Sequence, residues 1–327
     1  MKGKLRLATW IVLGIALAYA GLYIAASPRY RYTEKKLPGS FEEFYREKLA
    51  LSAREKVKPG NEEKLLRASP GKTPIAILYI HGFTASRAEG EEVMDRVARR
   101  EGANIYYLRV PGHGTSIEDL ARYSYRDFLD ASIEALLMMP ELGQRVVVAG
   151  TSMGGTIATW LAANYPDKVD GVILCSPFYD YVDPMGRIFE YPGCQSFAEL
   201  LKGKVHNAKR GPSSIEGWQG YWYGKRYFSS VKTLDNLRRL TADDSVYKKI
   251  TDPVLLLYYY RDEKNQDSGA SVAAMKEAYS KFGAGKPNPK SRAVAIAEGD
   301  HVLMSKWVKA DKERVEEACV EFLRAIR

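Results

Sequence analysis

The segment with the clearest chemical meaning is Gly150-Thr151-Ser152-Met153-Gly154, which fits the pattern G-x-S-x-G. It follows the β-branched run Arg145 to Ala149 and precedes a helical stretch from Thr156 to Asn164. A serine on a sharp turn between a buried strand and a helix is held in a strained conformation that presents its hydroxyl to a ligand. The pattern alone is frequent, so it is this context that predicts Ser152 as a nucleophile.

A serine hydroxyl needs a base to accept its proton and a third group to orient that base. The chain has four histidines: His81, His113, His206 and His301. In a fold of alternating strands and helices the base follows the nucleophile and the acid, and only His301 fits that order. It lies after the strand-like run Arg292 to Ala297 and before a helical pattern from about Ser305 to Ile326. We therefore predict His301 as the base.

Two aspartates compete for the role of the acid, because both follow the apolar strand Pro253 to Tyr259. Counting forward from the strand favours Asp262, whereas counting back from a helix that begins near Ser271 favours Asp267. We prefer Asp267 and keep Asp262 as the alternative. The other aspartate is then a solvated loop charge.

Acyl transfer also needs hydrogen-bond donors for the oxygen that becomes negative in the tetrahedral intermediate. The backbone amide of Met153, directly after the nucleophile, is one candidate. The apolar run Pro74 to Ile80 leads into a second candidate loop, in which Gly82 lets the backbone turn inward. This spacing makes the amide of Phe83 the second expected donor.

Five elements occur in one order along the chain: His81-Gly82-Phe83, Pro111-Gly112-His113-Gly114, Gly150-Thr151-Ser152-Met153-Gly154-Gly155, an aspartate after a late strand, and a final His301. This set resembles the α/β-hydrolase superfamily, and within it the branch of monoacylglycerol lipases, lysophospholipases and related carboxylesterases. The resemblance runs from about Thr73 to the C-terminus. It implies hydrolysis of an ester, usually of a fatty acyl group, without a metal or an organic cofactor. It also implies that Pro111 to Gly114 lies near the site and that His113 is structural.

Two features depart from that resemblance. The antiparallel hairpin that usually precedes the first parallel strand is not recognisable before Pro74, which leaves the edge of the sheet undefined. The loop from Tyr260 to Ala270 is longer than usual, which causes the ambiguity about the acid.

The fold class that we predict is α/β, with a mainly parallel sheet covered by helices on both faces. Mostly continuous apolar runs alternate with helical stretches, and six of them are predicted strands: Pro74 to Ile80, Asn104 to Arg109, Arg145 to Ala149, Gly171 to Cys175, Pro253 to Tyr259 and Arg292 to Ala297. We expect one hydrolase domain over residues 73–327, with a cap inserted at about 177–250.

The expected cap is rich in aromatic residues, of which Phe178, Tyr181 and Trp222 are our candidates for contact with the substrate. Such side chains can form an apolar wall over the site, or they can be the small core of the cap itself. Both interpretations stay open. The net charge of +9 suits a body near anionic lipid or a merely solvated basic surface. No nucleic-acid motif is present, the basic residues are mixed with acidic ones, and no nucleic acid is expected as a partner.

The N-terminus predicts a membrane segment over residues 1–26. Lys2, Lys4 and Arg6 precede about twenty uncharged residues, enough to cross a bilayer as one helix. We favour a retained signal anchor over cleavage after Ala18-Tyr19-Ala20, which would give a secreted or periplasmic protein. The folded body is expected outside the cytoplasm of a bacterial-type inner membrane. Residues 27–72 are expected to be a linker followed by an amphipathic helical segment.

Taken together, the sequence predicts a membrane-anchored serine hydrolase that cleaves carboxylic esters of hydrophobic or lipid-like substrates. One alternative is a peptidase of the proline-iminopeptidase type, in which Asp180 or Glu190 would bind a substrate amine. Another is a hydrolase-fold binding protein without activity. No protein partner is expected. The cysteines Cys175, Cys194 and Cys319 give neither a metal spacing nor an even number for disulfides.

Overall fold

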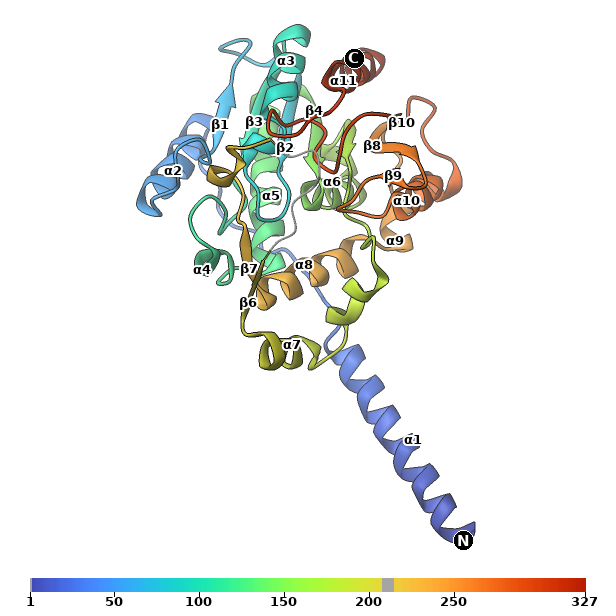
Figure 1. Cartoon of the computed structure of the whole chain (residues 1–327). Helices are drawn as coiled ribbons and strands as arrows, with labels where there is room; N and C mark the ends of the chain where they lie inside the picture. The colour runs from blue at the N-terminus through green and yellow to red at the C-terminus, as the bar shows by residue number, and fades with distance from the viewer. Residues whose placement is uncertain (1, 208–214) are drawn as a thin grey trace.

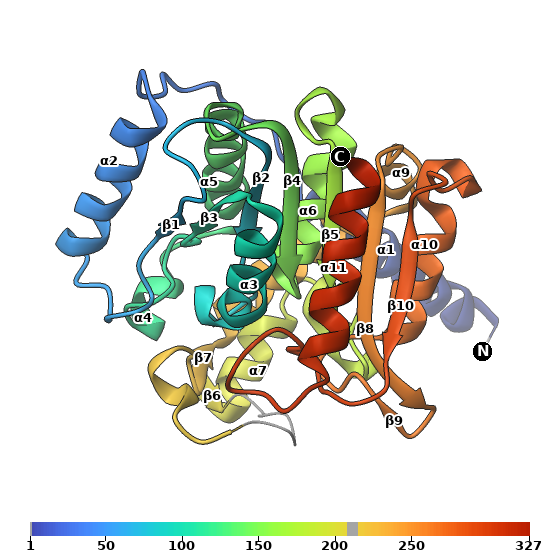
Figure 2. The ribbon, with the colours of Figure 1, turned by 90° about the horizontal axis from the view of Figure 1, so that it is seen from above.

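The computed structural model describes residues 2–207 and 215–327, with the side chains of the first helix described from Thr9 onward. Its main sheet has the strand order β1-β3-β2-β4-β5-β8-β10, with β9 pairing with β8 (Figure 2). The strands are β1 Lys64–Leu66, β2 Thr73–Ile80, β3 Asn104–Leu108, β4 Gly143–Thr151, β5 Gly171–Cys175, β8 Val254–Asp262, β9 Asn265–Gln266 and β10 Arg292–Ile296. Only β1 and β9 pair antiparallel among these strands. The prediction of a mainly parallel sheet, with all six of its strands, is confirmed.

Helices cover both faces of the sheet. Helices α3 (Glu91–Glu101) and α11 (Lys312–Ile326) lie on one face, and α5 (Tyr125–Met138), α6 (Met153–Asn164) and α10 (Val272–Gly285) lie on the other (Figure 2). In β2, Ile77 and Tyr79 belong to the core on the first face, whereas Leu78 and Ile80 belong to the core on the second. A strand that is buried on both sides needs apolar residues at every position, which explains the continuous apolar runs.

Parallel pairing brings the carboxyl ends of the central strands to one edge of the sheet. Ile80, the last residue of β2, pairs with Gly150 in β4, and Thr151 at the end of β4 pairs with Cys175. The turns that follow these strands therefore start side by side. In open α/β sheets this edge is where ligands bind.

The segment before the first parallel strand corrects one expectation. Helix α2 occupies Phe41–Arg54 and begins at its cap Ser40, as the amphipathic pattern predicts. The remainder of that segment is not helical, because residues 64–66 form β1 and extend the sheet antiparallel to β3. Lys64 is held there by Glu91 and Asp95, at 2.5 and 2.6 Å. Such long-range ion pairs leave no local pattern in the sequence.

The start of the C-terminal helix is also corrected. The sequence pattern predicts a helix from about Ser305, but α11 begins at Lys312, and Asp311 caps it through the amide of Arg314. Ser305 instead lies in a buried turn, where its hydroxyl donates to the carbonyl of Ala88 at 2.7 Å.

The chain between β5 and β8 forms a cap near the carboxyl edge of the sheet (Figure 1). Its main elements are α7 Cys194–Lys202, β6 Val205–Asn207, β7 Lys225–Tyr227, α8 Phe228–Thr241 and α9 Asp244–Tyr247. A shorter helix, α4 Ile117–Leu120, lies next to β7 (Figure 1). Residues 208–214 of the predicted cap lie outside the described residues.

Helix α1 (Lys2–Ala25) projects away from the folded body (Figure 1). Large apolar side chains between Trp10 and Ile24 are exposed on it, and Tyr23 contacts Tyr191 of the cap at 5.7 Å between ring centroids. Lys2, Lys4 and Arg6, which flank the predicted membrane segment, lie outside the residues whose side chains are described. In the part of the chain that the structure describes, no helix combines the length and the apolarity that a membrane crossing needs.

Candidate active site

Ser152 occupies the turn between β4 and α6 in a strained conformation. Its φ of 54° and ψ of −117° are rare for a residue with a side chain. A Cβ atom at Gly154 would come within 1.9 Å of the carbonyl oxygen of Ile80, so only glycine lets α6 approach β2 this closely. The amide of Ser152 donates to the carbonyl of Cys175 at 3.0 Å, which fixes the turn against β5.

Three side chains from separate strand ends form one hydrogen-bonded line. The Ser152 hydroxyl lies 2.8 Å from Nε2 of His301, so it can donate its proton to that nitrogen. Nδ1 of the same ring lies 2.8 Å from Oδ1 of Asp267 and donates to it. Ser152 comes after β4, Asp267 follows β9, and His301 follows β10. The residues predicted as nucleophile, base and orienting acid are therefore in contact.

The two candidate acids have different surroundings. Asp267 is 2% exposed, and its Oδ1 also accepts from the amides of Gly269 and Ala270 at 2.8 and 2.9 Å. Asp262 is exposed and accepts hydrogen bonds from the amides of Lys264 and Asn265 in the β8–β9 turn. Only Asp267 of the pair contacts His301. The long loop brings it there because β9 folds back on β8.

Charge around His301 favours its protonated form. Burial lowers the pKa of His301, but the Asp267 carboxylate, followed by Glu89 and Asp300, outweighs burial and raises it to about 9. Burial raises the pKa of Asp267, yet the facing imidazole and hydrogen bonds reverse this and hold it below its ordinary value. This arrangement stabilises the imidazolium that forms when the ring accepts the serine proton.

The expected oxyanion donors flank the Ser152 side chain. Met153 is the first residue of α6, where backbone amides have no acceptor within the helix. Phe83 follows Gly82, whose missing Cβ position lies 3.1 Å from the Cβ of Ser152. In the described part of the chain, neither amide donates to a protein acceptor. Both are free to receive a ligand oxygen.

Two buried histidines hold the loop that carries Phe83. Nε2 of His81 accepts from the amide of Val110 at 3.1 Å, and burial lowers the pKa of His81 to about 4. Nε2 of His113 accepts from the amide of Thr84 at 3.1 Å, and burial keeps the pKa of His113 well below its ordinary value. Neutral rings are needed to accept these bonds. Both histidines contribute structure, as the resemblance implies for His113.

One acidic residue near the site escaped the sequence analysis. Glu89 is 2% exposed, accepts a short hydrogen bond from the amide of Gly82, and lies beside the indole of Trp222 in the cap. Burial raises the pKa of Glu89 to about 7, although Gly82, His301 and Trp222 favour its charged form. Glu89 lies in a charged stretch, Arg87 to Glu92, and such a stretch in a sequence usually indicates a solvated surface.

The predicted substrate contacts converge on the same region. The amide of Phe178 donates to the carbonyl of Ser152 at 3.1 Å, and the Phe178 ring packs edge-on against Tyr181 at 4.9 Å. Tyr223 connects the cap to the loop that carries Phe83, since its amide donates to the carbonyl of Thr84 at 2.8 Å. Trp222, which lies beside Glu89, directly precedes Tyr223 in the chain. Residues of the cap are therefore bonded to the backbone of Ser152 and to the loop that carries Phe83.

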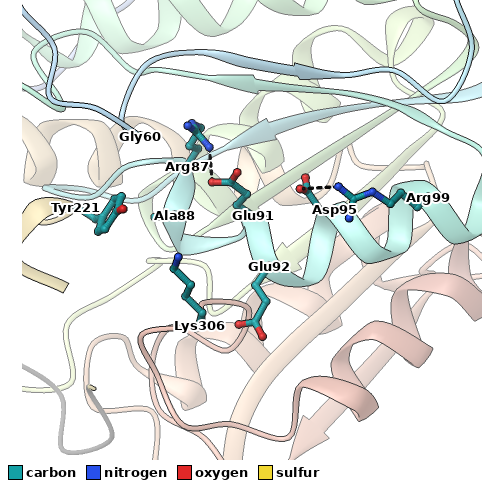
Figure 3. A pocket seen from close by; sticks show the side chains of 9 residues that line it. All are labelled: Gly60, Arg87, Ala88, Glu91, Glu92, Asp95, Arg99, Tyr221 and Lys306. Atoms are coloured by element: carbon teal, nitrogen blue, oxygen red, sulfur yellow. Dashed lines mark hydrogen bonds and ion pairs between the residues drawn. The ribbon is translucent and has the colours of Figure 1, made fainter. Parts of the chain in front are cut away.

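A surface hollow of about 400 Å³ lies beside α3, apart from the three side chains described above (Figure 3). Its walls carry the ion pairs Arg87–Glu91 and Arg99–Asp95, and the lining residues are Gly60, Arg87, Ala88, Glu91, Glu92, Asp95, Arg99, Tyr221 and Lys306. Such a charged lining does not suit an acyl chain. Among the described residues, no cluster of histidine, cysteine and acidic side chains is arranged to hold a metal ion.

Comparison with known proteins identifies the fold. Residues 75–302 match the family model of the alpha/beta hydrolase fold. The thermostable monoacylglycerol lipase of Bacillus sp. (strain H-257) is 32% identical over 94 residues, 29% of this chain and 37% of that lipase. Protein bem46 of Schizosaccharomyces pombe is 25% identical over 188 residues, 57% of this chain and 62% of that protein. Both matches span less than two thirds of the relative.

A similar solved structure comes from work on LipS and LipT, two metagenome-derived lipolytic enzymes. It has a TM-score of 0.66 and 19% sequence identity, and the superposition covers 82% of this chain and 99% of that chain. At this level of identity, the likeness speaks for the fold alone.

Proposed function

Because the chain belongs to the α/β-hydrolase fold family, we propose that it is a serine hydrolase of the lipase and esterase branch that cleaves carboxylic esters of hydrophobic acyl groups. The contact that carries the proposal is the 2.8 Å hydrogen bond between Ser152 Oγ and His301 Nε2. The two residues are 149 positions apart in the chain, and packing brings them together at the strand ends.

In the first step, Ser152 Oγ forms a bond to the carbonyl carbon of the ester while its proton moves to Nε2 of His301. The amides of Phe83 and Met153 donate to the carbonyl oxygen as it becomes negative. The intermediate then collapses, the carbon–oxygen bond to the alcohol breaks, and His301 returns the proton to the departing oxygen. An acyl group remains on Ser152.

In the second step, a water molecule attacks the acyl carbon and gives its proton to His301. Collapse of the second intermediate releases the carboxylic acid and returns the proton to Ser152. Asp267 keeps the proton of the neutral imidazole on Nδ1 and stabilises the imidazolium in both steps. Preorganised donors and charges of this kind supply most of the rate in such sites.

The surroundings of the cap acids favour an ester over an amino-terminal peptide. Asp180 is paired with Arg187 and lies 3.7 Å from Arg238, and Glu190 is paired with Arg238. Neither carboxylate is left over to bind a substrate amine. The aromatic rings of Phe178 and Tyr181 offer apolar contact to an acyl chain instead.

The proposal is tested by labelling the purified full chain with a fluorophosphonate probe, which reacts with activated serines. We expect labelling and ester turnover in the wild type, and the loss of both in Ser152→Ala. An exposed serine on α10 provides the control, because Ser280→Ala should label normally. Absence of labelling in a folded wild-type chain would refute the proposal.

We further infer that helix α1 associates with a membrane, with the folded body outside the cytoplasm. The support is the row of exposed apolar side chains on a helix that projects from the body (Figure 1). Ile15 and Leu17 are each 65% exposed there. Replacing both with lysine should release the full chain from carbonate-washed membranes, because each charge costs about 3 kcal/mol in a bilayer centre. Equal retention of the variant would contradict this inference.

A further inference from the structure

The cap contains two arginines whose surroundings differ. Arg238 of α8 is 7% exposed, and three carboxylates neutralise it: Asp235 at 3.1 Å, Asp180 at 3.7 Å and Glu190 in a short contact. This is the usual state of a charge in a protein interior.

Arg226 of β7 has no such partners. Its side chain is partly buried, its Nε atom is fully enclosed without a hydrogen-bond acceptor, and no carboxylate of a described residue lies within ion-pair distance. Burial lowers the pKa of Arg226, and Tyr181 is the group that opposes this effect. A desolvated cation without a counter-charge costs free energy that the fold alone does not return.

The position of Arg226 places this unpaired charge at the proposed site. Its guanidinium carbon lies 6.0 Å from the ring centroid of Phe83, the residue whose amide is a proposed oxyanion donor. Tyr181, its other neighbour, packs on Phe178, which hydrogen-bonds to the backbone of Ser152. The guanidinium is therefore next to the Phe83 ring and is connected to the Ser152 backbone through Tyr181 and Phe178.

We propose that Arg226 binds an anionic group of the substrate, a carboxylate or a phosphate, so that the preferred esters carry a negative charge close to the scissile bond. The inference rests on the proposed ester hydrolysis and narrows its substrate class. A guanidinium offers a planar fork of donors that matches both anions in a bidentate way. The bound anion replaces the carboxylate partner that Arg238 has and Arg226 lacks.

The electrostatics of the whole chain agree with this assignment. The net charge is +9, which raises the local concentration of anionic solutes around the body. His206, paired with Arg226 across the β6–β7 ladder, does not compete for the anion as a cation, because burial and the nearby Arg226 charge lower the pKa of His206. Of the pair formed by His206 and Arg226, Arg226 is then the cation that meets the substrate.

The test compares matched esters on the purified full chain. One pair is the mono-nitrophenyl ester of glutaric acid and its methyl-capped neutral counterpart, and the other is a 1-acylglycerol 3-phosphate and the 1-acylglycerol with the same acyl chain. The first pair probes a carboxylate and the second a phosphate. We expect the wild type to prefer the anionic member of at least one pair.

In Arg226→Gln, kcat/KM for that anionic member should fall about 10- to 100-fold more than for its neutral counterpart, as the loss of a charge-assisted contact predicts. Arg226→Lys should lose less, because it keeps the charge without the fork. Lys225→Gln is the matched control, since it removes the same charge from the exposed neighbouring residue and should leave the anion preference intact.

The outcomes separate this inference from the function on which it rests. Turnover of the neutral esters with no anion preference, or an equal loss on both members of a pair in Arg226→Gln, overturns the role of Arg226 and leaves the ester hydrolase standing. Failure of the wild type on all four esters together with absent fluorophosphonate labelling overturns both. Thermal unfolding of each variant shows whether Arg226→Gln is folded, and the lysine variant decides the question if it is not.

Discussion

The strand ends that carry Ser152 and the cap that covers them are packed in different ways. Around the serine, buried residues from several elements approach so closely that a single methyl group at Gly154 would strike the backbone of β2. The cap, in contrast, leaves large apolar side chains in solvent and buries charges in its interior. Its exposed apolar residues are Val182, Met185, Ile188, Tyr191, Phe197, Leu200, Leu201 and Ile215.

This difference matches a division of tasks. Hydrolysis of any ester needs the same atoms within a few tenths of an ångström, and a close-packed sheet edge provides such precision. The choice of substrate needs a surface that varies without disturbing that edge, and a cap inserted between two strands provides it. If the proposed function holds, the strand ends determine the reaction, and the cap determines the molecule that undergoes it.

The largest effect should come from the acid at the strand ends. We expect Asp267→Asn to lower kcat by about 10⁴-fold, because an amide no longer fixes the imidazole tautomer or stabilises the imidazolium. Nitrophenyl ester turnover measures this loss, and circular dichroism checks the fold. Asp262→Asn is the matched control and should stay within about twofold of the wild type, since the side chain is exposed in its own turn. The reverse ranking would assign the role to Asp262.

Substitution of one glycine in each region should show the same contrast in the free energy of unfolding. Gly154→Ala places a methyl group 1.9 Å from the carbonyl oxygen of Ile80, so it should lower the free energy of unfolding by about 3 kcal/mol or more. Gly220 of the cap has no atom within 4 Å of the same position, and Gly220→Ala should stay within about 0.5 kcal/mol of the wild type. Denaturant titration measures both values, and equal losses would show that the cap is as tightly packed as the strand ends.

Glu89, which lies between the strand ends and the cap, should affect the pH dependence of kcat/KM. The proposed mechanism needs neutral His301, whose pKa is raised to about 9, so kcat/KM should increase as the pH rises through that value. The Glu89 carboxylate contributes to the raised pKa of His301. The other groups around Glu89 are Tyr79, Trp222 and Cys175. Removing its charge in Glu89→Gln destabilises the imidazolium and should move the rising limb to lower pH, by about one unit.

The control for this shift is Glu91→Gln, which makes the same change two positions further along the chain. Glu91 pairs with Lys64 and Arg87 rather than with the site, so the limb should stay in place. A limb that stays in place in Glu89→Gln as well, or moves to higher pH, would show that the Glu89 charge does not act on His301.

The contrast also explains which features could be predicted from the sequence. Strands of a parallel sheet are buried on both faces, so the runs ending at Ile80 and Cys175 are apolar throughout and easy to recognise. The turn at Ser152 has a motif of its own, because the strained turn and the close helix require glycines at fixed positions. The spacing in the chain favours Asp267 but keeps Asp262 as an alternative, since the position of β9 follows from its pairing with β8.

Other features depend on contacts between distant segments and leave no periodic pattern. The strand at Lys64 is held by residues of α3, and Glu89 is buried next to Gly82 and beside Trp222 of the cap. Within the cap, a sequence cannot show that Arg238 has three acidic neighbours while Arg226 has none. Aromatic composition indicates that a cap exists, but its charge pairing follows from the tertiary structure.

The smallest effect should come from the exposed apolar surface of the cap. Leu200 of α7 is 81% exposed, so Leu200→Ser removes few contacts and should change the free energy of unfolding by less than about 0.5 kcal/mol. Turnover of a short, water-soluble nitrophenyl ester should also be unchanged. The matched control is Leu161→Ser in α6, a fully buried position where the same change should cost about 3 kcal/mol or more.

A loss in Leu200→Ser as large as that in Leu161→Ser would mean that α7 packs against another part of the chain in solution. An unchanged free energy of unfolding, which we expect, would have the opposite meaning. It would show that the solvent-facing apolar surface of α7 does not stabilise the fold. The exposed apolar surface of α1 is a second surface of this kind. A leucine would then stabilise the fold at the buried position in α6 and not at the exposed position in α7.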